Sequence, residues 1–204
     1  KKTSRQAEKC SALILGAGAA GVAITKILLA FGIGDVVVYD SFGPIYRGRT
    51  EKMNPYKVQL AEITNKNNEK GPLAEVFKRK DIFVGVARPN MVSQDMIRSM
   101  MPAPLVFPLS NPVGEITVEQ AYEAGAAIAV DGRTINNALA YPGLFRGALD
   151  AKAGDITFDM QIAAAHELGR LTPEGELLPN ILDRQIHKQV AQAVKEAWLL
   201  SAGK

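Results

Sequence analysis

Short apolar runs alternate with helical patterns along the first 132 residues of the chain. The apolar runs have the length and composition of strands buried on both faces, and the segments between them place apolar residues at helical spacing. Because no hairpin signal separates the runs, the pattern predicts an α/β fold, a doubly wound parallel sheet with helices on both faces. The expected strands are 11–15, 35–40, 81–86, 104–110 and 126–132, and the expected helices between them are 22–32, 54–64, 71–78, 93–100 and 117–125.

Two of these helices carry start signals. Asn54 is expected to be an N-cap with Pro55 at the first helical position, and Ser93 is expected to cap the helix at 93–100. After Gly132 the pattern becomes mostly helical. The segments 157–171 and 183–200 each carry one apolar stripe, which predicts extra C-terminal packing helices.

Composition excludes several classes of protein. With 47% hydrophobic and 22% charged residues, the chain is typical of a globular protein and too apolar for a disordered one. The net charge is only +3, and the basic residues are scattered among acidic ones, which argues against nucleic-acid binding. The single cysteine, Cys10, cannot form an internal disulfide, so we expect a cytoplasmic protein.

The segment from Ser11 to Gly32, SALILGAGAAGVAITKILLAFG, allows three interpretations. Its glycines and Lys26 disfavour a membrane-spanning helix. A signal peptide would explain the basic residues before it, but nothing downstream is typical of a secreted protein. A strand, a phosphate-binding turn and a helix account for the most residues, and we therefore expect no membrane segment.

The turn GAGAAG has the G-x-G-x-x-G spacing of dinucleotide-binding folds. Gly16 allows the tight turn, Gly18 a close approach of the backbone to a pyrophosphate, and Gly21 tight packing of the helix on the strand. The phosphates would lie against free N–H groups and near the positive end of the dipole of the following helix. The motif predicts a Rossmann-like domain.

An acidic residue ends the second expected strand. Asp40 follows Gly21 by nineteen residues, where a carboxylate is placed to accept a hydrogen bond from a ribose 2′-hydroxyl. Arg47 and Arg49 follow closely enough to reach the 2′-phosphate of NADP, but Asp40 would oppose that phosphate. We therefore expect NAD as the cofactor, with NADP as the alternative.

Residues that directly follow the strands are placed to contact a ligand. Asn111 precedes Pro112 and is held extended, so its amide can project outward, although Asn-Pro is also an ordinary turn sequence. Asn136 and Asn137 lie at the expected start of a helix, where an asparagine serves as an N-cap or contacts a ligand.

The chain is short of catalytic side chains. No Ser/His/Asp cluster and no metal-ligand spacing of Cys and His is present. His166 and His187 are expected on the surface, and Cys10 is expected to be inert. The sequence therefore predicts no catalytic residue and no metal ligand in this chain.

The order of the motifs resembles one family, the malic enzymes, and in particular the NAD-binding domain of the shorter bacterial type. The resemblance implies a parent enzyme, a homo-oligomeric dimer or tetramer, that oxidatively decarboxylates malate to pyruvate and carbon dioxide with NAD or NADP and Mg²⁺ or Mn²⁺. It spans nearly the whole chain and is carried by LILGAGAAGVAITKILLAFG, VVVYDSFGPIYRGR, MNPYKVQLAEITN, GPLAEVFKRKDIFVGVARP, LVFPLSNPVGEI and NNALAYPGLFRGALDA.

The resemblance also implies roles for single residues. It assigns the glycine turn to the pyrophosphate and Asp40 to the adenosine ribose. Asn111 would lie at the nicotinamide and substrate end, and Asn137 would hydrogen-bond the malate carboxylate. The predicted cofactor-binding residues are therefore Gly16, Gly18, Ala19, Ala20, Gly21, Asp40 and Asn111, and the predicted substrate-binding residues are Asn111 and Asn137.

The sequence departs from the family pattern in two places. The loop GRTINN is several residues shorter than the family's segment between its GR and NN, which affects how Asn136 and Asn137 are presented. Arg88, in ARPN, stands where the family has a smaller, more glycine-rich turn beside the cofactor. We expect Arg88 either to clash with the cofactor or to bind one of its phosphates.

The family's general base, general acid and metal ligands precede the glycine motif, where this chain has only fifteen residues. We expect a piece of a longer protein in which 1–204 is a single NAD-binding domain. Its parts would be a linker at 1–10 from an absent N-terminal catalytic domain, a Rossmann core at 11–135 and a mostly helical part at 136–204. Such a chain would bind NAD weakly and turn over no malate.

Two alternatives stay open at this point. The chain could be a stand-alone NAD-binding module that senses the cofactor and regulates a partner. It could also be the cofactor domain of another two-domain dehydrogenase, acting on amino acids or methylene-tetrahydrofolate. The combination of SNPVGEI with NNALAYPG argues against this second alternative.

Overall fold

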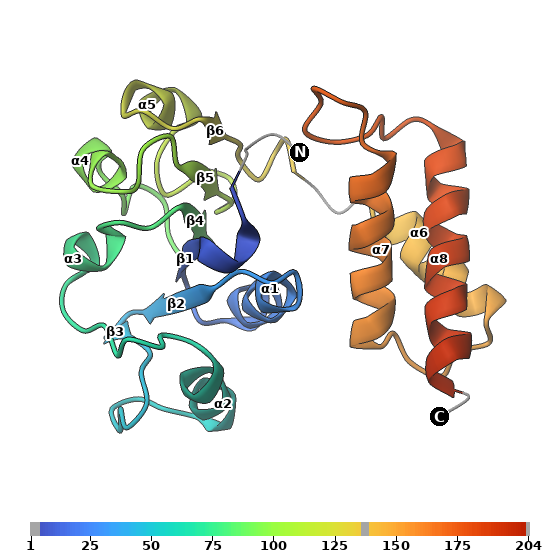
Figure 1. The fold of residues 1–204 in the computed structure, drawn as a ribbon, viewed down its shortest axis with the longest axis horizontal. Coiled ribbons are helices and arrows are strands. Elements are labelled where there is room, and N and C mark those ends of the chain that lie inside the picture. Colours follow the sequence, from blue (N-terminus) through green and yellow to red (C-terminus); the bar gives the residue numbers. More distant parts are fainter. Residues whose placement is uncertain (1–4, 136–138, 203–204) are drawn as a thin grey trace. The chain divides into compact units, whose positions relative to one another are not determined.

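The computed structural model describes residues 5–135 and 139–202, and the chain divides into two compact units. We call Arg5–Ile135 the sheet unit, and we call the helices of residues 139–202 the helical unit. Figure 1 labels the elements of both units along the chain.

Six strands form one sheet in the sheet unit, in the order β3-β2-β1-β4-β5-β6. Five of them run parallel, which confirms the predicted doubly wound fold. Leu13 of the central strand lies opposite Val37 on one side and Phe83 on the other. The parallel strands are β1 (Ser11–Leu15), β2 (Asp35–Asp40), β4 (Ile82–Gly85), β5 (Leu105–Pro108) and β6 (Ile128–Ala129).

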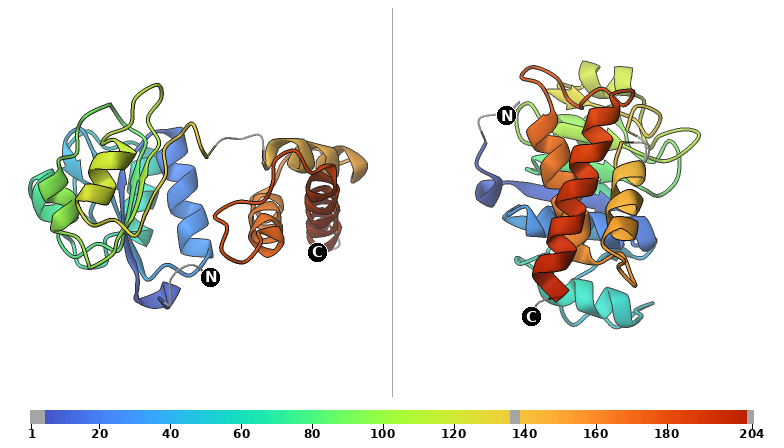
Figure 2. Two further views of the ribbon diagram at one scale, coloured as in Figure 1. Left: turned by 90° about the horizontal axis from the view of Figure 1, so that it is seen from above. Right: turned by 90° about the vertical axis from the view of Figure 1, so that its right-hand side faces the viewer.

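Helices cover both faces of this sheet, as the view along its edge shows (Figure 2). A short 3₁₀ helix, η1 (Ala7–Lys9), precedes β1. The α-helices of the unit are α1 (Ala19–Ala30), α2 (Pro55–Ile63), α3 (Leu73–Phe77), α4 (Gln94–Arg98) and α5 (Val118–Glu123).

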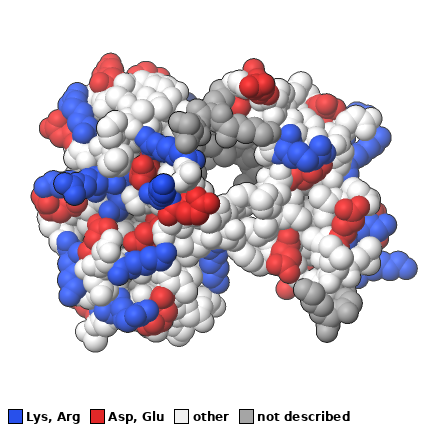
Figure 3. Space-filling model, viewed as in Figure 1, with Lys and Arg blue, Asp and Glu red and all other residues white. Residues whose placement is uncertain are grey.

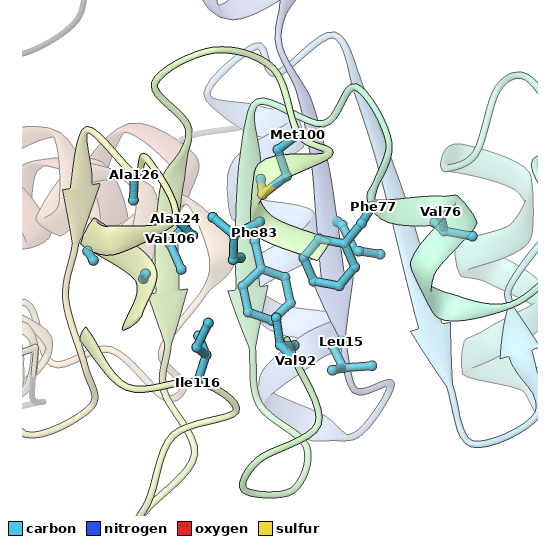
Figure 4. Close-up of a cluster of buried hydrophobic side chains, with 14 of the residues drawn as sticks. Leu15, Val76, Phe77, Phe83, Val92, Met100, Val106, Ile116, Ala124 and Ala126 are labelled. Atoms are coloured by element: carbon cyan, nitrogen blue, oxygen red, sulfur yellow. The ribbon is translucent and has the colours of Figure 1, made fainter. Parts of the chain in front are cut away.

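Successive residues of the strands feed two separate cores. Leu13 and Leu15 belong to a cluster that is closed by α3, α4 and α5 (Figure 4). Within it the rings of Phe77 and Phe83 pack with their centroids 4.9 Å apart. Ile14 points to the opposite face and packs in a second cluster that α1 and α2 cover. Both faces of the sheet are therefore buried, as the continuous apolar runs predict.

The predicted helix starts are confirmed. The side chain of Asn54 accepts a hydrogen bond from the Lys57 N–H at 2.9 Å, and Pro55 is the first residue of α2. Ser93 accepts from the Met96 N–H at 3.3 Å at the start of α4.

Two strands differ from the expectation. β3 (Gly43–Pro44) runs antiparallel to β2, because an Asp40 carboxylate oxygen accepts from the Phe42 N–H and Gly43 takes φ +115°, so the chain reverses within three residues. β6 has only two residues rather than seven. It ends early because Asp131 accepts from the N–H groups of Arg133 and Thr134, which turns the chain away from the sheet.

Three helices form the helical unit, α6 (Tyr141–Asp150), α7 (Phe158–Leu171) and α8 (Arg184–Ala202). The predicted apolar stripes meet in its core, with Met160 and Ala164 of α7 packed against Val190 of α8. α6 begins at Tyr141 with Ala140 as an N-cap that makes no side-chain bond. The expected helix start at Asn136 and Asn137 lies outside the described residues.

Charge is mixed on the surface. On the face drawn in Figure 3, Lys and Arg side chains are interspersed with Asp and Glu side chains. None of the described helices combines the length and the apolar character that a membrane crossing requires.

Candidate functional site

A pocket of about 520 Å³ opens at the carboxyl ends of the central strands. This is the edge at which doubly wound sheets bind their ligands. Its walls come from the turn after β1, the end of β2, the first turn of α2 and the loop after β4. The lining residues are Leu15, Gly16, Ala17, Gly18, Tyr39, Asp40, Ser41, Lys57, Ala87, Arg88 and Met91.

The turn between β1 and α1 is built from glycines with different tasks. Gly16 takes φ +118°, and a Cβ there would lie 2.6 Å from the carbonyl oxygen of Val86. A Cβ at Gly21 would lie 1.9 Å from the carbonyl oxygen of Gly16, so α1 packs directly on the turn. A Cβ at Gly18 would meet nothing within 4 Å, which leaves open space in front of the helix.

The start of α1 faces this open space. Ala19 and Ala20 are its first two residues and are exposed. Their N–H groups precede the first intrahelical hydrogen bond, so they are available to a negatively charged ligand. Gly18 therefore leaves open space at the positive end of the helix.

Asp40 lies at the end of β2 and is 8% exposed. Its two carboxylate oxygens receive four hydrogen bonds. The Phe42 N–H donates to Oδ1 at 2.8 Å, Nη2 of Arg49 lies 2.9 Å from both oxygens, and Nζ of Lys57 lies 2.7 Å from Oδ2. Burial by itself would raise the pKa of Asp40, but the hydrogen bonds from Lys57, Phe42 and Arg49 lower it below its ordinary value.

The two arginines considered for a 2′-phosphate have other partners. Arg49 is buried against Asp40, and its Nη1 donates to the carbonyl oxygens of Gly43 and Pro44. Arg47 forms an ion pair of 3.0 Å with Glu62. Neither Arg47 nor Arg49 lines the pocket. The cationic side chains that line it are those of Lys57 and Arg88.

The loop after β5 carries Asn111, which is exposed and joined to Pro112 by a cis peptide bond. Asn111 does not line the pocket described above. Its loop nevertheless emerges at the same edge of the sheet, because β5 pairs in parallel with β4. Asn137 lies outside the described residues.

Sequence reasoning missed three residues here. Lys57 lies on the first turn of α2, and its place three residues after the N-cap Asn54 is the signal that could have found it. Met91 lines the pocket from the loop after β4. Glu115 is fully buried, although an acid after SNPVG resembles an ordinary surface residue.

Other candidates lie away from the pocket. Burial raises the pKa of the Cys10 thiol, which disfavours the reactive thiolate. His166 is exposed on α7, and Nε2 of His187 lies 3.0 Å from the carbonyl oxygen of Ile181. Within residues 5–135 and 139–202, no three His, Cys, Asp or Glu side chains are grouped as a metal ion would need.

No family model matches the chain, but malic enzymes are found among both its curated relatives and the solved structures. The chain is 41% identical over 192 residues to the bifunctional malic/malolactic enzyme of Bacillus subtilis, covering 89% of this chain and 47% of that enzyme. It is 37% identical over 207 residues to the NAD-dependent malic enzyme of Geobacillus stearothermophilus, covering 97% of this chain and 43% of that enzyme.

Solved structures give the same result. The NAD-dependent malic enzyme of Thermotoga maritima superimposes with a TM-score of 0.88 at 36% identity, covering 94% of this chain and 52% of that one. The chain thus spans about half the length of the relatives that it matches. It belongs to the malic enzyme family and corresponds to a part of its members.

Proposed function

We propose that this chain is the NAD-binding part of a malic enzyme, an oxidoreductase that converts malate to pyruvate and carbon dioxide with NAD or NADP and Mg²⁺ or Mn²⁺. One observation carries the proposal. Gly16, Gly18 and Asp40, predicted from their spacing to hold a pyrophosphate and a ribose, line a single pocket at the carboxyl edge of the sheet. The names of the relatives identify malic enzymes, one of them NAD-dependent, and the reaction is the one that the resemblance to that family implies.

The pocket suggests how NAD lies across the sheet. The pyrophosphate occupies the open space at Gly18 and accepts hydrogen bonds from the N–H groups of Ala19 and Ala20. The adenosine ribose lies at Asp40, over β2. The nicotinamide end then extends over β4 and β5 toward Asn111, because dinucleotides span this edge of a doubly wound sheet.

NAD, when bound, supplies a nicotinamide ring that accepts a hydride from C2 of malate. The residues of this chain bind and orient that ring and exclude water around it. Asn111 contacts the nicotinamide and the substrate, and Asn137 hydrogen-bonds the malate carboxylate.

The ribose at Asp40 has to compete with Lys57. All the acceptor positions of the carboxylate are taken by Phe42, Arg49 and Lys57. Of the two cationic partners, Lys57 is the more exposed, at 17% of its side chain against 4% for Arg49. A ribose hydroxyl therefore takes the place of Nζ of Lys57 on Oδ2.

The described residues do not form a site for Mg²⁺ or Mn²⁺, because no three of their His, Cys, Asp or Glu side chains are grouped around one point. The acid, the base and the metal ligands would come from the rest of the parent enzyme, which we propose to be a cytoplasmic homo-oligomer, a dimer or a tetramer. The chain alone is then a cofactor-binding part, without turnover of malate.

Calorimetric titration of the full chain with NAD and with NADP tests this proposal. We expect saturable binding of one NAD per chain and weaker binding of NADP, because the 2′-phosphate meets Asp40. Binding of neither cofactor at millimolar concentration would overturn the proposed function. NADP binding much tighter than NAD would overturn the role given to Asp40, and malate-dependent formation of NADH by this chain would overturn its inactivity.

A further inference from the structure

The carboxyl group of Glu115 lies in the interior between two loops of the sheet unit. We call residues 86–92 the β4 loop and residues 109–115 the β5 loop. Glu115 is 0% exposed. Its Oε1 accepts from the Ala87 N–H at 2.8 Å and from Oγ of Ser110 at 2.5 Å, and its Oε2 accepts from the Ser110 N–H at 3.4 Å. One carboxyl group therefore joins both loops.

The backbone beside Glu115 reinforces this connection. The carbonyl oxygen of Glu115 accepts from the Val92 N–H at 3.0 Å, and that of Gly114 accepts from the Asn90 N–H at 3.1 Å. The β5 loop is thus bonded along the β4 loop from residue 87 to residue 92.

The neighbouring strand is adapted to this carboxyl group. A Cβ at Gly85, the last residue of β4, would lie 2.3 Å from both Cδ and Oε2 of Glu115. Only a glycine leaves room for the acid in this place. A buried carboxyl group is costly unless it is hydrogen-bonded, and the hydrogen bonds from Ala87 and Ser110 offset that cost here. Because its hydrogen bonds join the loops after two neighbouring strands, the acid fixes the position of one loop relative to the other.

Both loops lie at the edge of the sheet over which the nicotinamide half of NAD is proposed to extend. The β4 loop contributes Ala87, Arg88 and Met91 to the pocket, and the β5 loop carries Asn111. We infer that Glu115 is a positioning residue, which holds the two loops in the arrangement that receives the nicotinamide half of NAD. This inference rests on the proposed function. It assigns Glu115 no contact with the cofactor itself.

Two variants of Glu115 and one control test the inference. Glu115→Met keeps the length of the side chain and removes every acceptor. Glu115→Gln keeps one oxygen that can accept from Ala87 and from Oγ of Ser110. Glu119→Gln changes an exposed acid of the next helix in the same way. Each protein is titrated with NAD and with ADP, which lacks the nicotinamide half.

We expect the NAD dissociation constant of Glu115→Met to rise by about tenfold, the loss typical of a deleted buried acceptor, and its ADP dissociation constant to change by less than about threefold. The NAD dissociation constant of Glu115→Gln should lie between those of Glu115→Met and the unchanged chain, because its amide oxygen restores part of the hydrogen-bond network. Glu119→Gln should bind both ligands like the unchanged chain.

Equal losses for NAD and ADP would overturn the inference, because they indicate a general structural role. Unchanged NAD binding by Glu115→Met would also overturn it. If Glu115→Met does not fold, Glu115→Gln is used in its place. A ratio of its NAD to its ADP dissociation constant equal to that of the unchanged chain would then contradict the inference. Absence of NAD binding by the unchanged chain would overturn the proposed function and this inference with it.

Discussion

Arg49 and Asp40 form a buried ion pair in which Nη2 of Arg49 lies 2.9 Å from each carboxylate oxygen. Their side chains are only 4% and 6% exposed. Lys57 adds a third charge at 2.7 Å from Oδ2, from the side of the pocket. The carboxylate proposed to recognise the ribose is therefore held by one interior cation and covered by one that a ligand can displace.

Lys57→Met should sharpen the preference for NAD. Without Nζ, Oδ2 is free for the ribose hydroxyl, whereas a 2′-phosphate meets a carboxylate with one compensating cation fewer. We expect the ratio of the NADP to the NAD dissociation constant to rise by about tenfold, the size of an interaction with a charged hydrogen-bonding partner. Calorimetry with both cofactors measures this ratio. Lys26→Met, which removes an exposed lysine of α1, is the matched control, and the same ratio in both variants would contradict the prediction.

Asp40→Asn should change the pH dependence of stability. Because the pKa of Asp40 is lower in the folded chain than its ordinary value, the charged group stabilises the fold above about pH 4 and loses that effect as the pH falls through the lowered pKa. We expect the free energy of unfolding of the variant at pH 7 to be about 3 kcal/mol lower than that of the unchanged chain, because Arg49 is left buried without its partner charge.

The difference between the unchanged chain and Asp40→Asn should begin to shrink below about pH 4, where the carboxylate of the unfolded chain becomes protonated, and should continue to shrink toward the lowered pKa of the folded chain. Urea unfolding between pH 7 and pH 3 measures it. Asp95→Asn is the control, because the Asp95 side chain is 90% exposed in its pair with Arg98. A difference that stays constant over this pH range would show that the charge of Asp40 does not stabilise the fold.

Gly21→Ala should destabilise the sheet unit. The added Cβ would lie 1.9 Å from the carbonyl oxygen of Gly16, and backbone cannot move aside as a flexible side chain can. We expect a loss of about 3 kcal/mol, the upper part of the range for overpacking. Gly154→Ala, where the new Cβ meets nothing within 4 Å, is the control in urea unfolding. Equal stability of the two variants would refute the close packing of α1 on the turn.

Gly147→Val should loosen the helical unit alone. A Cβ at Gly147 of α6 would lie 2.4 Å from the carbonyl oxygen of Ala191 in α8, so a side chain at this position would push the two helices apart. Hydrogen exchange should show faster exchange in α6, α7 and α8, with β1, β2 and β4 protected as before. Equal loss of protection in both units would mean that they do not behave as separate compact parts.

The sequence predicted the fold where the signals are local. Gly16, Gly18 and Gly21 and the following helix lie within one strand-turn-helix segment, and Asp40 ends the next strand, so spacing alone determines their order. β3 escaped prediction because its reversal depends on Asp40 binding the Phe42 N–H and on the left-handed conformation of Gly43. A two-residue strand leaves no hydrophobic period to detect.

The partners of the site could not be predicted because they are distant along the chain. Lys57 reaches Asp40 across 17 residues and Glu115 reaches Ala87 across 28. Neither contact follows from helical or strand periodicity, because each depends on how whole helices, strands and loops pack against one another. The two asparagines were predicted from the family resemblance and not from local spacing. Asn111 lies in the loop after β5, at the predicted edge of the sheet, whereas Asn137 lies outside the described residues.

The most direct test of the central claim is calorimetric titration of Gly18→Val with NAD, beside the unchanged chain and Gly154→Val. Gly18 and Gly154 both have open space where a side chain would stand, but only Gly18 lines the pocket. We expect one NAD to bind to the unchanged chain and to Gly154→Val. We expect binding at least about tenfold weaker for Gly18→Val, because the new side chain occupies the place of the pyrophosphate. NAD binding by Gly18→Val as tight as that of the unchanged chain would contradict the central claim.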